Sequence, residues 1–447
     1  MKVEIQAKIK KILEGFSTHA QDLIKTLGTN LVLAATSVGT GILVARLLGP
    51  EKRGALAAAM VWPLLFQGLG AFGLPQAVVY FAGRNHRDPG GVAGTALALG
   101  GVQALLVPAA GFLLMPWLLQ VQGEAVIANA RWYLLAIFAG FLGSYPMFVL
   151  QGLARMSALN ALRLITPISY LIFLLVLMFV GIRSPKAVIL VLVGLSFLQA
   201  GVNIIGTKWL VNSKGRLERG LVRPLLTYGC HSWLSTIPIM LNSRLDQLLM
   251  TLFLPAEQLG FYVVAVSWSA CLQPLAGAFA TVAFPRIAQS QSPSEGSAIL
   301  TRNFQTYLIL NSLLAAVALV VTPLAIKILF GASYSPAIPS ALLLVVGGAA
   351  LGMNYVLSDS LRGLGLPLGA AFGEVIGLGL TIILLLLLLR PLGIIGAALA
   401  SCLAYFGTFA GLVWYTCRRT DIMAKNLFHM TWRDLHSILS MPFKKAC

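Results

Sequence analysis

Long apolar stretches of about 20 residues follow one another along almost the whole chain. A helix rises about 1.5 Å per residue and the hydrocarbon core of a bilayer is roughly 30 Å thick, so each stretch is long enough to cross a membrane. The pattern predicts about twelve spans, six in each half of the chain. Their approximate bounds are 28–48, 55–81, 93–119, 132–154, 164–182, 187–211, 228–253, 260–284, 305–329, 338–361, 366–389 and 393–416.

Composition narrows the class of protein. The chain has 447 residues, of which 58% are hydrophobic and 10% are charged, and its formal net charge is +18. An ordinary soluble domain carries roughly 25% charged residues, so this composition excludes a soluble enzyme and a disordered chain. With the N-terminus inside, 23 of the 32 lysines and arginines fall on the cytoplasmic side. The positive-inside rule therefore places both termini in the cytoplasm, and we expect no nucleic-acid partner.

The two halves carry a weak internal repeat. A shift of 206 positions superposes Glu51 on Glu257, Trp62 on Trp268 and Gln67 on Gln273, within eight identities over thirty ungapped positions. Six spans per half is an even number, so both halves enter the membrane in the same direction. A parallel repeat of this kind predicts a transporter fold of two six-helix lobes with the substrate site between them.

Five segments are expected from this pattern, two of them flanking the lobes. At the N-terminus, apolar residues repeat near helical spacing among lysines, namely isoleucines, Phe16 and Leu23. This pattern suits an amphipathic helix that lies on an anionic leaflet, and docking to a partner is the alternative. The segments are an amphipathic interfacial segment 1–27, an N-lobe 28–211, a basic cytoplasmic linker 212–227, a C-lobe 228–416 and a basic amphipathic cytoplasmic tail 417–447.

Ionisable side chains within spans are costly, so each is a candidate for function. In span seven, His231, Ser235, Asn242 and Asp246 are separated by 4, 7 and 4 residues and fall on one helical stripe. Arg244 is two residues before Asp246, so the two side chains cannot point to the same side of a helix. A structural ion pair or a snorkelling arginine is the competing interpretation. Thr40 is the repeat equivalent of Asp246.

The other candidates are polar or charged residues in or beside spans. Arg155 and Arg163 could bind a pyrophosphate, because its paired oxygens match the fork of donors on a guanidinium group. The alternative is that the two arginines only set the orientation of the chain in the membrane. Gln67 and Gln273 are cavity donors or join neighbouring helices. The candidate ligand-binding residues are Asn30, Thr40, Gln67, Arg155, Arg163, Asn242, Arg244, Gln273 and Asn354, and the candidate ion-coupling residues are Asp246, Asp359 and Glu374. We expect the glycines around Glu374 to permit close helix packing.

Motifs of catalysis and cofactor binding are not found. The sequence has no metal-ligand cluster, nucleophile elbow or phosphate-cradling glycine loop, so we expect no catalytic residue, metal or cofactor. The longest extracytoplasmic gap is roughly a dozen residues near 119–131, which argues against a membrane-embedded glycan-modifying enzyme.

Three stretches carry a family resemblance. They are residues 45–51 with Gly54, residues 244–246 leading to 259–262, and residues 329–331 with Tyr334 and Ala337. These stretches resemble the bacterial polysaccharide-transport proteins. These form the O-antigen flippase-like branch of the multidrug/oligosaccharidyl-lipid/polysaccharide exporter superfamily. The resemblance covers nearly the whole chain.

The resemblance implies a flippase in the bacterial cytoplasmic membrane that moves a polyprenyl-pyrophosphate-linked oligosaccharide by alternating access for surface polysaccharide biosynthesis. The expected partners are this lipid-linked substrate, anionic lipids of the cytoplasmic leaflet and other polysaccharide-assembly proteins. A cation-coupled multidrug antiporter of the same superfamily is the alternative. Such antiporters rely on acidic residues buried in a lobe, and the first span here has none.

Overall fold

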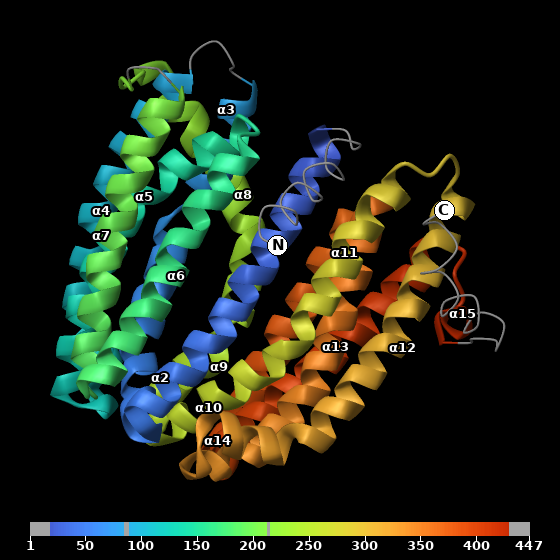
Figure 1. Ribbon diagram of the computed structural model, residues 1–447. Helices are drawn as coiled ribbons and strands as arrows, with labels where there is room; N and C mark the ends of the chain where they lie inside the picture. Colours follow the sequence, from blue (N-terminus) through green and yellow to red (C-terminus); the bar gives the residue numbers. More distant parts are fainter. Residues whose placement is uncertain (1–17, 85–88, 212–214, 429–447) are drawn as a thin grey trace, which may run out of the picture. The chain divides into compact units, whose positions relative to one another are not determined.

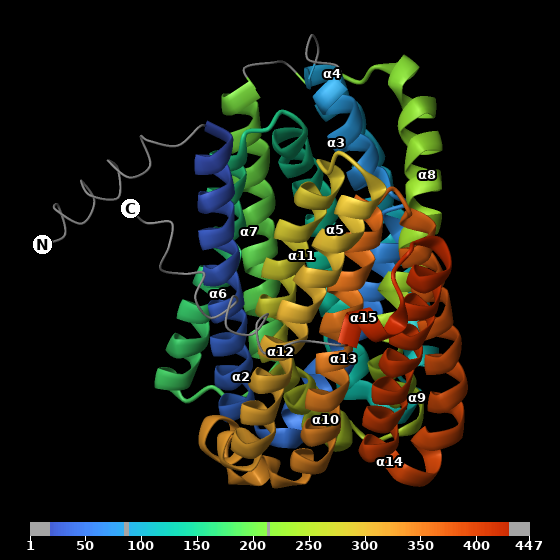
Figure 2. The same cartoon turned by 90° about the vertical axis from the view of Figure 1, so that its right-hand side faces the viewer.

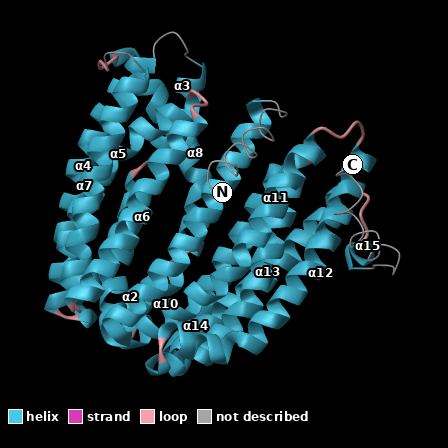
Figure 3. Ribbon diagram, viewed as in Figure 1, coloured by secondary structure: helices cyan, strands magenta, loops and turns pink. Residues whose placement is uncertain are grey.

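The computed structural model describes residues 18–84, 89–211 and 215–428, and every regular element within these ranges is helical (Figures 1 and 3). The all-α architecture predicted from the apolar pattern is therefore confirmed. The chain divides into two compact units, Met1–Ile237 and Pro238–Cys447. Most of the expected N-terminal interfacial segment and of the C-terminal tail lies outside the described residues.

The first unit is a bundle whose central helix is α5. Its helices are α2 (Thr18–Gly70), α3 (Leu74–Arg84), α4 (Pro89–Leu118), α5 (Glu124–Gly152), α6 (Met156–Val180), α7 (Pro185–Val211) and the start of α8 (Arg219–Asn242). Helix α5 packs against α2, α3, α4, α6 and α7 (Figure 1). In its most apolar stretch 61% of the residues are buried, compared with 6% in α6. An apolar helix that is buried on nearly all sides is the core of such a bundle.

The second unit has the same organisation around α13. Its helices are α9 (Leu245–Phe253), α10 (Ala256–Ser269), α11 (Gln273–Ala288), α12 (Pro293–Ala325), α13 (Ile338–Gly363), α14 (Pro367–Arg419) and α15 (Ala424–Phe428). Helix α13 packs against α10, α11, α12 and α14 (Figure 2), and 67% of its most apolar stretch is buried. Helices α5 and α13 correspond to the fourth span of each half, so the two units share one plan, as the repeat predicts.

Nine helical segments within the described residues are long and apolar enough to cross a membrane, whereas the sequence predicted about twelve spans. Two pairs of expected spans each lie in one helical run that is bent at a glycine. Helix α2 holds span one and most of span two, which ends in α3, and α14 holds spans eleven and twelve. The expected seventh span, 228–253, is divided between α8 and α9, and neither is among these nine segments. The multi-span class is confirmed, while the number twelve and the side of the termini stay predictions.

Each of the two long helices turns at a glycine. Gly49 in α2 has φ 73° and Gly393 in α14 has φ 54°, both in the left-handed region that favours glycine. The repeat aligns Gly49 with Pro255, and Pro255 has extended backbone between α9 and α10. The chain therefore bends at equivalent positions of the two halves.

The helical stripe expected across span seven is interrupted, which corrects the sequence-based prediction. Helix α8 ends at Asn242, and Arg244, with φ −141°, leaves the helical conformation before α9 begins. The Ser243 hydroxyl donates to the Met240 carbonyl at 2.8 Å and satisfies one acceptor at the helix end. Asn242 and Asp246 therefore lie on two different helices.

The glycines around Glu374 pack as expected. A side chain at Gly373 would overlap Leu412, and one at Gly377 would overlap Thr408. The first half of α14 therefore lies directly against its own second half, on the other side of the bend at Gly393.

Candidate functional site

A cavity of about 440 Å³ lies within the second unit, among α8 to α11, α13 and α14. It brings together four candidate residues from the sequence: Asn242, Asp246, Gln273 and Glu374. The polar residues that line it are Asn242, Ser243, Asp246, Gln247, Ser269, Gln273, Tyr355, Glu374 and Tyr405. No lysine, arginine or histidine is among its described lining residues, so the cavity is an acidic and hydrogen-bonding environment.

Asp246 is held firmly at the start of α9. Its Oδ1 accepts a hydrogen bond from the Gln247 amide at 2.7 Å, and its Oδ2 accepts one from the Tyr262 hydroxyl at 2.5 Å. The Tyr262 hydroxyl lies 3.4 Å from Ser401 Oγ of α14. A carboxylate in the first turn of a helix is also stabilised by the helix dipole. Burial leaves the Asp246 side chain 8% exposed, so its polar contacts are internal.

Glu374 is the second carboxylate of the cavity, and it belongs to the first half of α14. Asn242 Nδ2 donates to Glu374 Oε2 at 3.5 Å, and Asn242 Oδ1 accepts from Thr381 Oγ1 at 3.0 Å. The amide at the end of α8 therefore bridges two positions of α14. Glu374 is half-buried and faces the cavity.

Gln273 opens α11 and lines the same cavity. Its Oε1 is buried and has no hydrogen-bond partner among the described residues. A buried acceptor without a partner is costly, so a donor in the cavity would satisfy it. Two carboxylates and a free carbonyl oxygen are the groups that a proton, a cation or a ligand with hydroxyl donors would contact. The described residues contain no group of three or more histidine, cysteine, aspartate or glutamate side chains arranged to hold a metal ion.

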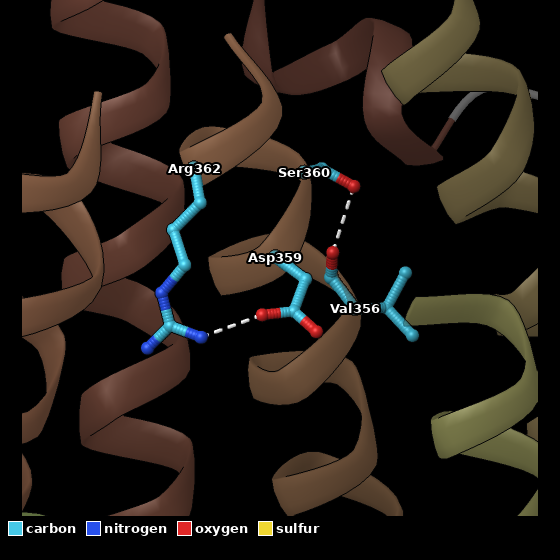
Figure 4. Close-up of polar contacts among 4 residues, drawn as sticks. All are labelled: Val356, Asp359, Ser360 and Arg362. Atoms are coloured by element: carbon cyan, nitrogen blue, oxygen red, sulfur yellow. Dashed lines mark hydrogen bonds and ion pairs between the residues drawn. The ribbon is translucent and has the colours of Figure 1, made fainter. Parts of the chain in front are cut away.

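Three other candidates of the second unit lie outside the lining of this cavity. Asn354 is 3% exposed and donates from Nδ2 to the Tyr405 carbonyl at 3.0 Å, which joins α13 to α14. Asp359 forms an ion pair with Arg362 at 2.6 Å one turn along α13 (Figure 4). Arg244 is exposed, and in the part of the chain that the structure describes it forms no ion pair with Asp246.

In the first unit, the structure brings Arg163 and Asn30 together. Arg163 Nη2 donates to Asn30 Oδ1 at 3.2 Å, beside a second bond from Asn160 to Thr26 at 2.9 Å, so polar contacts join α6 to α2. Arg155 is exposed at the start of α6, eight residues before Arg163. This spacing is about 12 Å along a helix axis, so the two guanidinium groups belong to different turns.

The remaining two candidates of this unit make local contacts. Thr40 donates to the Ser37 carbonyl at 3.0 Å within α2. Gln67 is half-buried on α2, and its side-chain amide lies against Gly140 of α5, where a larger residue would collide with it. The contact with Gly140 favours helix joining for Gln67, whereas its repeat partner Gln273 lines a cavity.

Sequence reasoning missed the polar residues around the two carboxylates. Tyr262 donates to Asp246 and lies beside Ser401, Thr381 donates to Asn242, and Tyr405 lines the cavity. One signal was available for Tyr262. A tyrosine in an apolar helix needs a partner for its hydroxyl, and Tyr262 lies on α10, the helix after that of Asp246.

The sequence pattern of one family, described as polysaccharide biosynthesis protein, matches residues 20–291 of this chain. The probable low-salt glycan biosynthesis flippase Agl15 of Haloferax volcanii is 27% identical over 194 residues, which are 41% of this chain and 39% of that protein. An uncharacterized membrane protein of Methanocaldococcus jannaschii is 26% identical over 202 residues, 44% of this chain and 40% of that protein. The chain therefore matches about two fifths of the length of these curated relatives.

Two solved structures share the fold over nearly their whole length. The lipid II flippase MurJ in an inward closed conformation has a TM-score of 0.76 and 14% identity, covering 93% of this chain and 92% of MurJ. An inward-facing multidrug resistance transporter of the MATE family and MOP superfamily has a TM-score of 0.71 and 15% identity, covering 89% and 95% of the two chains. At these identities the likeness concerns the fold.

This chain is a multi-span membrane protein with the fold of the flippases and transporters of the MOP superfamily. The match over residues 20–291 extends through the first unit and well into the second, which is more than half of the sequence. The chain belongs to the polysaccharide biosynthesis protein family.

Proposed function

We propose that this protein is a flippase that translocates a polyprenyl-pyrophosphate-linked oligosaccharide across the cytoplasmic membrane by alternating access. Membership in the polysaccharide biosynthesis family carries the proposal, since the match covers residues 20–291. The relative Agl15 is itself named a probable glycan biosynthesis flippase, which supports a lipid-linked glycan as the substrate class.

The membrane that houses the protein is part of the proposal. The sequence resemblance favours a bacterial cytoplasmic membrane and an O-antigen-like glycan, whereas the two curated relatives come from Haloferax volcanii and Methanocaldococcus jannaschii. The transported class of molecule is the same in either setting. Anionic lipids and polysaccharide-assembly proteins are the further partners that we propose.

The cavity of the second unit supplies a means of coupling transport to an ion gradient. Asp246 and Glu374 line it together, and each is fixed by at least one hydrogen bond from another helix. A carboxylate inside a membrane protein that is held by neutral donors keeps an oxygen available for a proton or a cation. We therefore assign ion coupling to these two residues, with Asn242 and Gln273 as polar neighbours.

The experiment that tests the function is deletion of the gene in its host with analysis of the lipid-linked glycans on each membrane face. We expect loss of surface glycan and accumulation of the lipid-linked precursor on the cytoplasmic face, with rescue by the wild-type gene. A deletion strain with normal surface glycan and no accumulated precursor contradicts the proposal.

A cation-coupled antiporter is the second candidate, and the two carboxylates in one cavity favour it. Purified protein in liposomes distinguishes the two functions. Exchange of a cationic dye for sodium ions or protons supports the antiporter, while movement of a lipid-linked saccharide between leaflets supports the flippase.

A further inference from the structure

A second cavity in the C-terminal unit lies between α11 and α12, which run side by side in Figures 1 and 2. Its volume is about 700 Å³, within the range of ordinary ligand sites. Arg286 reaches it from the last turn of α11, and Arg302 from the third turn of α12. Both arginines are among the 23 basic residues of the predicted cytoplasmic side.

Several of the polar groups around this cavity can donate hydrogen bonds. Neither guanidinium has a carboxylate partner among the described residues, and Asn303 Nδ2, which also lines the cavity, is buried and has no hydrogen-bond partner there. Gln289 adds a further amide. A guanidinium presents up to five N–H donors, which match the oxygens of a phosphate group in a fork geometry.

No described acidic side chain lines the cavity. The nearest carboxylate along α12, that of Glu295, accepts a hydrogen bond from the Gln291 amide at 2.8 Å, and Ser292 Oγ accepts from the Glu295 amide at 3.2 Å. Ser292 is the N-cap of α12, so Glu295 is already engaged at the helix start. Arg286 and Arg302 are both exposed, so a ligand from outside the protein can reach them.

Apolar side chains also line the cavity. Phe279 and Ile299 line it together with small residues of α11. Arginines beside an apolar wall, at one end of a membrane helix pair, fit a molecule that has an anionic head and a hydrocarbon chain. A soluble phosphate compound would use the guanidinium groups but not the apolar wall.

We propose that the cavity between α11 and α12 binds the phosphate group of a membrane lipid, with Arg286, Arg302 and Asn303 as its donors. This site is separate from the cavity of Asp246 and Glu374, and it does not depend on whether the protein translocates a saccharide. Lipid at this position lies between two helices of the unit and contributes to their packing.

Binding is measured on the purified full chain in detergent by native mass spectrometry. The probes are phosphatidylglycerol, and diacylglycerol with the same chains but no phosphate. Each charge-assisted hydrogen bond that is lost weakens binding by about tenfold or more. We expect the double variant Arg286→Gln/Arg302→Gln to bind phosphatidylglycerol at least about tenfold more weakly than the wild type, with no change for diacylglycerol.

A matched control removes the same net charge elsewhere. Arg219 and Arg223 are exposed on the first turns of α8, and neither lines this cavity. The variant Arg219→Gln/Arg223→Gln is expected to keep wild-type affinity. Equal weakening in both double variants means that general electrostatics holds the lipid, and it overturns the proposal.

A third variant addresses folding and the role of the buried amide. Asn303→Asp is nearly isosteric and places a carboxylate beside the two arginines, so we expect a loss of phosphatidylglycerol binding with a thermal midpoint at or above that of the wild type. Unchanged binding overturns the site. Inorganic phosphate and diphosphate form the last arm: if they bind at the same affinity as the lipid, the ligand is a soluble phosphate compound and the lipid assignment is wrong.

Discussion

The Tyr262 hydroxyl donates a 2.5 Å hydrogen bond to Asp246 Oδ2, and both side chains are buried in the second unit. The other carboxylate oxygen accepts from the Gln247 amide at 2.7 Å. Since each carboxylate oxygen has two lone-pair sites, Asp246 is oriented by these bonds and still has acceptor capacity towards the cavity. Orientation by Tyr262 and access to the cavity are therefore separable by mutation.

Substitution Tyr262→Phe removes the donor and keeps the ring. We expect the free energy of unfolding to fall by about 1–3 kcal/mol, because a buried acceptor loses its partner. The thermal midpoint in detergent measures this change. The control is Tyr228→Phe, which removes a hydroxyl at a half-exposed position of the first unit, where the ring stacks on Tyr80. Equal shifts in the two variants would show that the bond to Asp246 contributes no special stability.

Asp246 and Asp359 were both candidates for ion coupling, and their environments differ. Asp246→Asn removes the charge from the cavity while keeping the side-chain shape, so we expect transport to fall by about tenfold or more with normal membrane levels. Asp359→Asn breaks an ion pair whose side chains are 43% and 32% exposed, and such pairs contribute about 0–1 kcal/mol. We expect its transport to stay within about twofold of the wild type, since neither residue of this exposed ion pair lines the cavity.

Transport of lipid-linked glycan in proteoliposomes, normalised to folded protein, measures both aspartate variants. Loss of folded Asp246→Asn protein in proportion to the lost transport would show a structural role for Asp246. Equal transport defects in the two variants would contradict the assignment of coupling to the cavity.

The apolar pattern was sufficient to predict the fold class, because spans of about 20 apolar residues have few alternatives in a helical membrane protein. It did not predict where helices merge or break. Spans one and two are joined without a loop because the left-handed Gly49 turns the chain between them, whereas span seven divides at Ser243 and Arg244. Both outcomes depend on the backbone conformation of one or two residues, which periodicity does not report.

The two carboxylates of the candidate site could be predicted from the sequence, but the residues around them could not. Buried charge is rare in an apolar chain, so Asp246 and Glu374 stood out by residue type alone. Their convergence on one cavity depends on the fold of α14, which carries Glu374 to the end of α8. Asn354 was a candidate ligand-binding residue like Asn242, although its amide joins α13 to α14 internally.

We expect substitution of Asn354 to affect stability and substitution of Asn242 to affect transport. Asn354→Ala leaves the Tyr405 carbonyl without its donor, so we expect the free energy of unfolding to fall by about 1–3 kcal/mol with normal transport per folded molecule. Asn242→Ala removes the bridge to Glu374 and Thr381 beside the cavity, so we expect reduced transport per folded molecule. Thermal midpoints and proteoliposome transport, measured on the same preparations, test the contrast. The reverse pattern would place the functional amide at Asn354.

Gly49 supplies the turn between the two expected spans of α2 through its backbone conformation. Its φ is 73°, and a side chain there would meet no atom within 4 Å, so any cost of substitution comes from the left-handed conformation and not from a clash. We expect Gly49→Ala to lower the free energy of unfolding by about 1–2 kcal/mol, Gly49→Asn by less, and Gly49→Val by more, because asparagine tolerates this region and a β-branched residue does not. The matched control is Gly28→Ala in the same helix, which also has open space and lacks a positive φ; we expect it to be neutral or slightly stabilising, because alanine favours the helix over glycine. Thermal midpoints of the four purified variants measure the series, and a Gly49→Val protein as stable as Gly49→Asn would show that α2 runs straight through this position.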